Sequence, residues 1–110
     1  MMRLPLSSAA SSLLRALARR AEVPRDRILL IEWASTDWQS LTFVGERHRI
    51  ALRICGPAAN DACRRLIDDI EEADFVLVGH VLAEIAVMEP PAPSDDGSVV
   101  LTIEALTIAE

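Results

Sequence analysis

The side chains that could do acid–base or metal chemistry are few and widely spaced. Histidine occurs only at His48 and His80, and Glu84 follows His80 by four residues. On a helix this spacing would place two ligands one turn apart, but the residues around it favour a strand, where four residues span about 13 Å. That distance is too long for one ion to be shared. The sequence therefore predicts no metal site, and an acid/base enzyme using His80 with Glu84 stays an alternative.

The two cysteines offer weak support for nucleophilic chemistry. Cys55 is expected at the end of a strand, and His48, the nearest base, lies toward the other end of that strand. A catalytic thiol needs a base beside it and a lowered pKa. Cys63 falls on the apolar side of an expected helix and is predicted to pack there. Two cysteines are too few for a disulfide framework or a four-cysteine zinc site, so we expect a cytoplasmic protein.

Motifs for cofactor binding are not found. The four glycines, at positions 45, 56, 79 and 97, are too scattered for a phosphate-binding loop or a dinucleotide fingerprint. The Asp95-Asp96-Gly97 segment does not have the ligand spacing of a calcium loop. We therefore predict no cofactor and assign no catalytic residue.

Composition narrows the class of protein further. The chain has 110 residues, of which 51% are hydrophobic and 25% charged, which is typical of one soluble globular domain. Its 17 acidic and 11 basic residues give a net charge of −6, which argues against nucleic-acid binding. All the basic residues are arginine, a usage that indicates a bacterial gene of high GC content. No run of 18 apolar residues occurs, so we predict no membrane span.

The spacing of apolar residues predicts the helices and strands that position these side chains. Apolar residues recur at helical spacing twice, and residue types change to β-branched and aromatic ones between and after these stretches. The first 21 residues are rich in Arg, Ser and Ala, as targeting segments are, but we favour an ordinary first helix, with residues 1–5 disordered. The pattern predicts a helix over 6–22, a hairpin over 28–54 with its turn at 44–48, a helix over 57–73, a strand over 75–89, a loop over 90–97 and a strand over 98–109.

This order, α-β-β-α-β-β, predicts a two-layer α+β sandwich. Two hairpins make a four-stranded antiparallel sheet, and two one-sided helices cover one of its faces. The order is similar to that of a ferredoxin-like domain whose first strand has been moved to the end. It also resembles the small acidic dimeric chaperones of type III secretion, which implies a protein-binding role as one alternative. Both resemblances rest on element order alone.

The strand expected over 75–89 carries apolar residues on both faces. Its odd positions suit a core face beneath the helices, whereas its even positions would be polar if that face met water. An apolar second face indicates a partner surface, and we expect a homodimer that forms through this face or through a strand edge. The residues assigned to the interface are Val76, Val78, Leu82 and Met88, with Leu106 and Ile108 from the last strand.

Charged residues are expected around the same surface. Arg49 and Arg53 can reach Glu32, Glu84 or Glu104 on neighbouring strands, as cross-strand ion pairs that form a polar rim. The arginines could instead hold an anionic ligand, which is the less favoured interpretation.

The aromatic residues give a second binding hypothesis. Trp33 and Trp38, with an arginine and with His80 at the rim, could line a pocket for an aromatic or anionic small molecule. The favoured prediction is a non-enzymatic, self-associating interaction module. The alternatives are a small-molecule binding protein, a small acid/base enzyme and a secretion-chaperone-like protein binder.

Overall fold

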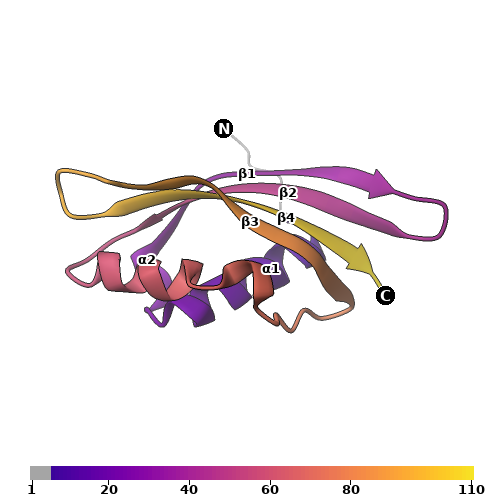
Figure 1. Cartoon of the computed structure of the whole chain (residues 1–110), viewed down its shortest axis with the longest axis horizontal. Coiled ribbons are helices and arrows are strands. Elements are labelled where there is room, and N and C mark those ends of the chain that lie inside the picture. Colours follow the sequence, from indigo (N-terminus) through magenta and orange to yellow (C-terminus); the bar gives the residue numbers. More distant parts are fainter. Residues whose placement is uncertain (1–5) are drawn as a thin grey trace.

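The computed structural model describes residues 6–110, so the predicted disorder of residues 1–5 lies outside the described part of the chain. It has two layers, a four-stranded antiparallel sheet with two helices on one face (Figure 1). The predicted class and element order are confirmed. The elements are α1 (Ser8–Ala21), β1 (Ile28–Gln39), β2 (Val44–Ile54), α2 (Ala59–Ile67), β3 (His80–Pro93) and β4 (Val99–Ala109), with single 3-10 turns at Arg25–Arg27 and Ile70–Glu72.

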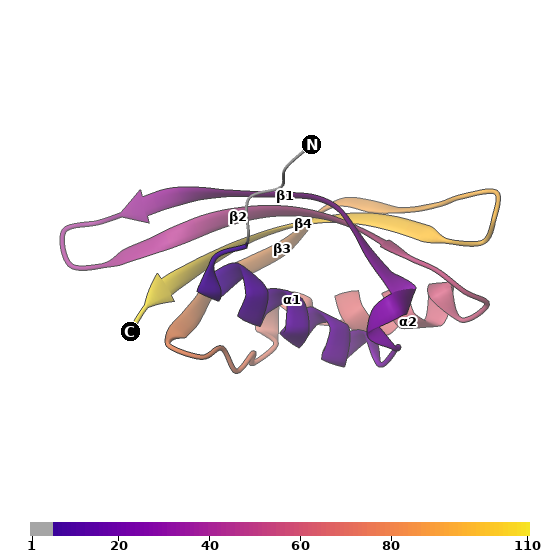
Figure 2. The ribbon, with the colours of Figure 1, turned by 180° about the vertical axis from the view of Figure 1, so that it is seen from behind.

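The sheet has the strand order β1-β2-β4-β3, so the second strands of the two hairpins pair at its centre. There Ile50 of β2 lies opposite Ile103 of β4. Each half of the chain supplies one helix and one hairpin, and the two hairpin connections lie at opposite ends of the sheet (Figure 2). This arrangement leaves β1 and β3 as the two edges.

The core lies between the sheet and the helices. Leu13 and Leu17 of α1 and Leu66 of α2 are fully buried against β2 and β4 residues such as Leu52 and Ile103. Burying each of these aliphatic side chains contributes about 1.5–3 kcal/mol. The first helix, whose composition resembles that of a targeting segment, is thus part of the core.

The first hairpin turns earlier than predicted. Its connection is residues 40–43, where the Ser40 N–H donates to the Phe43 carbonyl at 2.9 Å, so the prediction of a turn at 44–48 is wrong. Gly45 lies inside β2 opposite Ile108. A Cβ at position 45 would collide with the Thr107 backbone oxygen, so glycine is needed here for close strand approach. The first strand is irregular at Ile31, between the paired positions 30 and 32.

The second helix is shorter than predicted. It ends at Ile67, and Asp69 then adopts the left-handed conformation (φ 50°) before a separate 3-10 turn. The Arg20 side chain of α1 donates to the backbone oxygens of Leu66, at 2.8 Å, and Asp68, which satisfies carbonyls that the end of a helix leaves free. Pro57 precedes the helix by two positions and is not its first residue.

The third strand begins later and ends later than predicted. Residues 75–79 are not strand, and β3 runs from His80 to Pro93, so the hairpin connection is 94–98 and not 90–97. The pairing with β4 shifts register between positions 82 and 84, 87 and 89, and 89 and 92. Each shift can exchange the two faces, so the predicted odd–even assignment fails along β3. Leu82, expected outside, packs against the core, whereas Val81, expected inside, is exposed.

Candidate interaction surface

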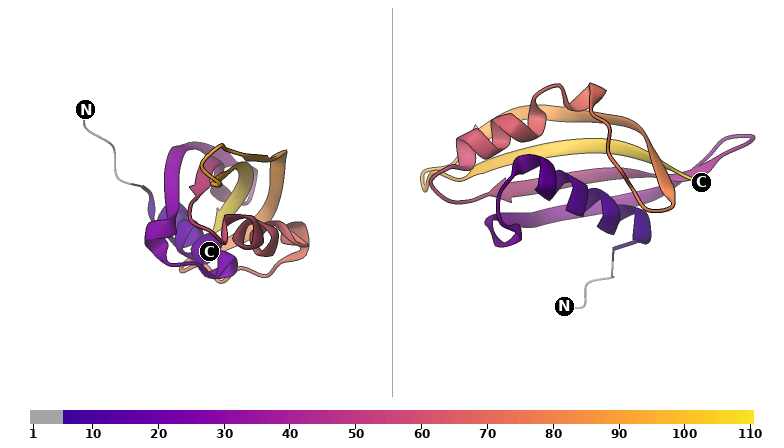
Figure 3. Two further views of the ribbon diagram at one scale, coloured as in Figure 1. Left: turned by 90° about the vertical axis from the view of Figure 1, so that its left-hand side faces the viewer. Right: turned by 90° about the horizontal axis from the view of Figure 1, so that it is seen from below.

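The outer face of the sheet is the side opposite the helices, as the end-on view shows (Figure 3). Strand alternation places Arg47, Arg49 and Arg53 of β2 on this face, because the intervening even-numbered residues from His48 to Ile54 are buried. On β4 the same rule places Glu104 and Leu106 outward between buried Ile103, Ala105 and Thr107. Glu84 of β3 pairs with Leu106 and lies on this face too.

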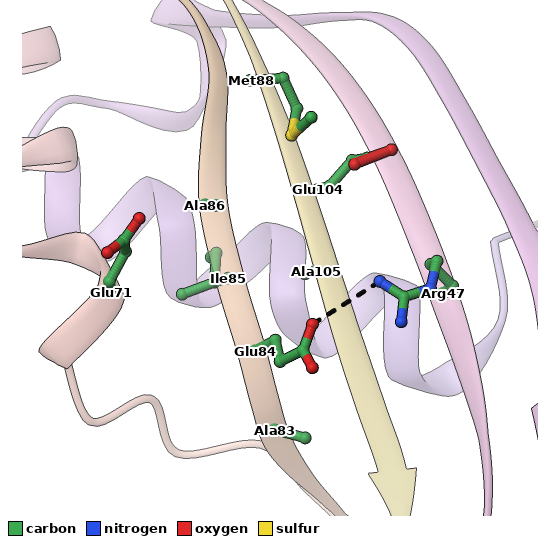
Figure 4. Close-up of a pocket in the computed structure, with 9 residues that line it drawn as sticks. All are labelled: Arg47, Glu71, Ala83, Glu84, Ile85, Ala86, Met88, Glu104 and Ala105. Atoms are coloured by element: carbon green, nitrogen blue, oxygen red, sulfur yellow. Dashed lines mark ion pairs between the residues drawn. The ribbon is translucent and has the colours of Figure 1, made fainter.

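Two ion pairs cross this face. The Arg47 guanidinium lies 3.7 Å from the Glu84 carboxylate (Figure 4). Both residues are paired with Leu106 on the strand between them. Leu106 is only 4% exposed. Arg49 reaches its cross-strand neighbour Glu104 at 3.4 Å, so this cross-strand ion pair is present, whereas its place at the rim of an interface stays a prediction. Half-exposed pairs of this kind contribute at most about 1 kcal/mol each.

Arg53 does not pair with a glutamate as expected. Its guanidinium donates to the hydroxyls of Ser98, at 3.0 Å, and Ser94, at 3.5 Å, in the connection between β3 and β4. Hydrogen bonds from the Ser98 hydroxyl and backbone N–H to Asp96 lower the pKa of the Asp96 carboxyl, and the Arg53 charge adds to this effect. The Arg53 side chain therefore binds the connection between β3 and β4 and does not form a cross-strand ion pair.

The six predicted interface residues separate into three groups. Leu106, Ile108 and Met88 belong to the paired strands β4 and β3, and Met88, 43% exposed, stands at a register shift. Leu82 packs toward the core. Val76 and Val78, 83% and 75% exposed, lie in the segment before β3 and not on the sheet, so their predicted place on a strand face is wrong.

A shallow hollow of about 360 Å³ lies along the β3 edge of this face. It forms where small side chains leave space between Met88 and the Arg47–Glu84 pair (Figure 4). Its remaining lining residues are Glu71, Ala83, Ile85, Ala86, Glu104 and Ala105. With three glutamates and one ion-paired arginine, the hollow is predominantly acidic.

His48 is fully buried. The Ser35 hydroxyl lies 2.8 Å from its Nδ1 and the Thr107 hydroxyl 2.9 Å from its Nε2. The Trp33 indole N–H donates to the Ser35 oxygen at 3.0 Å. These bonds are mutually consistent when His48 carries its proton on Nε2. They tie β1, β2 and β4 together.

Burial sets the protonation state of His48. Desolvation lowers the pKa of its imidazole, the nearby Glu46 carboxylate partly opposes this, and His80 adds to the lowering. One signal in the sequence could have located this residue: His48 has the same parity as Ile50, Leu52 and Ile54, the predicted core side of that strand.

The residues proposed for a ligand pocket do not converge. Trp33 contacts His48 on the helix side of the sheet, whereas strand alternation places Trp38 on the outer side, opposite Gly45. His80 opens β3, with its Nδ1 3.0 Å from the Val78 carbonyl oxygen. The aromatic and charged members of the proposed set thus lie on different faces.

Cys63 packs in the core, as the sequence predicts. Burial raises the pKa of the Cys63 thiol, which disfavours its thiolate form, and both cysteines are free. Among residues 6–110, no group of three or more His, Cys, Asp or Glu side chains is arranged to hold a metal ion. No helix in this part of the chain is long and apolar enough to cross a membrane.

In the described part of the chain, the fold is a two-layer α+β domain whose second sheet face has no helix over it and carries two cross-strand ion pairs. No protein-family model matches the chain, and no curated protein sequence matches it significantly.

Proposed function

We propose that this chain is a non-enzymatic interaction module that self-associates as a homodimer. The observation that carries the proposal is the outer face of the sheet, which no helix within residues 6–110 covers and which combines apolar side chains with paired charges. Met88, and Leu29 opposite the outward-facing Arg53, are both more than 40% exposed in the single chain. Covering about 400 Å² of apolar surface gives a gross gain of about 10 kcal/mol, enough to offset much of the cost of association.

The side chains with potential chemistry support a structural role. Both ring nitrogens of His48 are engaged by hydroxyl groups inside the sheet, and Cys63 packs in the core. The proposal accordingly assigns them to stability and not to a reaction. Free cysteines fit a reducing compartment, so we place the homodimer in the cytoplasm.

The proposal is tested by the molar mass in solution. Size-exclusion chromatography with light scattering from about 1 to 100 μM is expected to give twice the 12.0 kDa of the chain. A mass of one chain across this range would contradict the proposal. Met88→Asp, which places a charge on the uncovered face, is expected to shift the dimer toward monomer. Arg64→Glu, on the exposed side of α2, changes charge away from this face and serves as the control.

A further inference from the structure

The two central strands and Glu84 of β3 give the outer face a positive column beside a negative column, and Glu32 of β1 adds a carboxylate on the other side of the arginines. Arg47 and Arg49 stand on β2, whereas Glu104 and Glu84 stand on β4 and β3. The charged ends remain accessible: the side chains of Arg49 and Glu104 are 52% and 32% exposed within the single chain. The charged groups of each column can therefore form further ion pairs with groups of opposite charge on another molecule.

Two-fold symmetry restricts how two such faces can pack. An axis in the plane of the interface and perpendicular to the strands would lay β2 over the partner's β2, so arginines would meet arginines. An axis parallel to the strands, between β2 and β4, would lay β2 over the partner's β4. Because Arg49 and Glu104 are at the same height in the register, each Arg49 would then face the Glu104 of the other copy. At the Arg49–Glu104 level only the second arrangement is complementary in charge, and at the level of Ala51 and Thr102 it sets Glu32 opposite Glu89 of the other copy.

The edges of the sheet are poorer interfaces than the face. The second half of β3 contains Pro90, Pro91 and Pro93, which have no N–H to donate, and β3 carries three register shifts. The β1 edge is interrupted at Ile31 and carries exposed Glu32 and Asp37. These features are those with which proteins prevent edge-to-edge pairing.

The area of the face is adequate for a stable dimer. Four strands spaced about 4.8 Å apart, with about ten residues each at about 3.3 Å, give a flat footprint of about 600 Å² per copy. Side-chain relief raises the accessible area above this value. Specific interfaces bury about 800 Å² per partner, with smaller ones near 600 Å².

We infer that two copies of this chain pack outer face to outer face about an axis parallel to β2 and β4, with Arg49 of each copy facing Glu104 of the other. This inference rests on the proposed self-association and specifies its geometry. Aligned sheet packing of this kind forms a four-layer molecule, with the helices of both copies outermost.

The test is complementation between two charge-reversal variants. Arg49→Glu alone sets a new carboxylate against Glu104 of the other copy, and Glu104→Arg alone sets a new guanidinium against Arg49. Each variant by itself is expected to dissociate at least about tenfold more readily than the wild type. An equimolar mixture restores opposite charges at both contacts, so native mass spectrometry with one variant ¹⁵N-labelled is expected to show the mixed dimer. Arg64→Glu, mixed with the wild type, controls for charge alone.

The possible outcomes distinguish a wrong dimer geometry from a failure of the proposed self-association. A wild-type dimer whose single variants associate normally, or whose mixture stays monomeric, would overturn the geometry and leave self-association intact. A monomeric wild type would overturn both. Should a single variant fail to fold, Arg49→Cys and Glu104→Cys in a Cys55→Ser background provide a second measurement. With a bismaleimide crosslinker long enough to join two sheets packed about 10 Å apart, the mixture is expected to form the 49–104 crosslink between copies faster than either variant crosslinks to itself, and the reverse order would also overturn the geometry.

Discussion

Arg47 and Glu84 meet at 3.7 Å across the strand that lies between them, and Leu106 occupies the paired position on that strand. Three neighbouring strands thus place Arg47, Leu106 and Glu84 side by side in one row across the sheet. The row explains how a leucine on the side without helices is nearly excluded from solvent. Apolar side chains on this face are partly covered by the aliphatic portions of their charged neighbours.

Removing the Glu84 charge is expected to have little effect on the stability of the fold. Because both side chains of the pair are substantially exposed, Glu84→Gln should lower the free energy of unfolding by less than about 1 kcal/mol. Urea denaturation followed by circular dichroism measures the change, with Arg64→Gln, which breaks the exposed Arg64–Asp61 pair, as the matched control. A loss several times larger than that of the control would show that the Arg47–Glu84 pair supports the packing of Leu106.

Gly45 should tolerate no side chain, because a Cβ there would overlap the backbone oxygen of Thr107. Gly45→Ala is expected to cost about 2–3 kcal/mol by forcing β2 and β4 apart. The comparison is Gly97→Ala, where the φ of 87° is unfavourable for alanine but the space is open, at about 1 kcal/mol. Equal losses in urea denaturation would mean that the central strands separate without difficulty.

Hydrophobic periodicity is sufficient to predict the two layers of the fold, but it does not predict which side of every strand is buried. The parity of residues 50, 52 and 54 indicates the correct buried side of β2, because that strand pairs with β4 without a shift. Strand β3 lies at an edge and shifts register three times. A register shift is set by pairing with another strand, and alternation within one segment does not contain that information.

The candidate surface can be predicted from the sequence only where the strands alternate regularly. The Arg49–Glu104 pair follows from two strands of regular alternation, and both residues can be identified in the sequence. Val76 and Val78 are misplaced by the sequence pattern because their apolar run resembles a strand, although Gly79 (φ 74°) breaks it before His80. The hydrogen bonds of His48 depend on Ser35 and Thr107, which are distant in sequence, so no local pattern reveals them.

Stability should fall as the pH is lowered through the titration of His48. Burial lowers the pKa of His48 in the folded state below its ordinary value of 6.5, so the unfolded chain binds the proton more readily. The contribution is complete above pH 6.5 and is lost as the pH falls below this value toward the folded pKa. Urea denaturation at about pH 7.5 and about pH 5.5 is expected to show a smaller unfolding free energy at the lower pH.

His48→Gln tests the assignment of this effect to one residue. Glutamine retains hydrogen-bonding groups but does not titrate, so the loss between the two pH values should shrink, while stability at the higher pH drops by about 1–3 kcal/mol as the fitted hydroxyl contacts are lost. His80→Gln, at the start of β3, is the matched control and should leave most of the pH dependence in place. An unchanged pH dependence in His48→Gln would assign the effect to other groups.

Leu82 and Met88 lie on the same strand, but a charge at each position should affect a different property of the protein: fold stability at Leu82 and dimer formation at Met88. Leu82 packs against the core, so Leu82→Asp buries a carboxylate and is expected to lower the free energy of unfolding by more than about 3 kcal/mol. Met88 is exposed at the rim of the hollow, so Met88→Asp should change the unfolding of the monomer by less than about 1 kcal/mol while weakening the dimer. Thermal melting and light scattering on the same samples measure both effects. A Met88→Asp protein that melts as early as Leu82→Asp would place Met88 in the core, and one that stays fully dimeric would remove this rim from the interface.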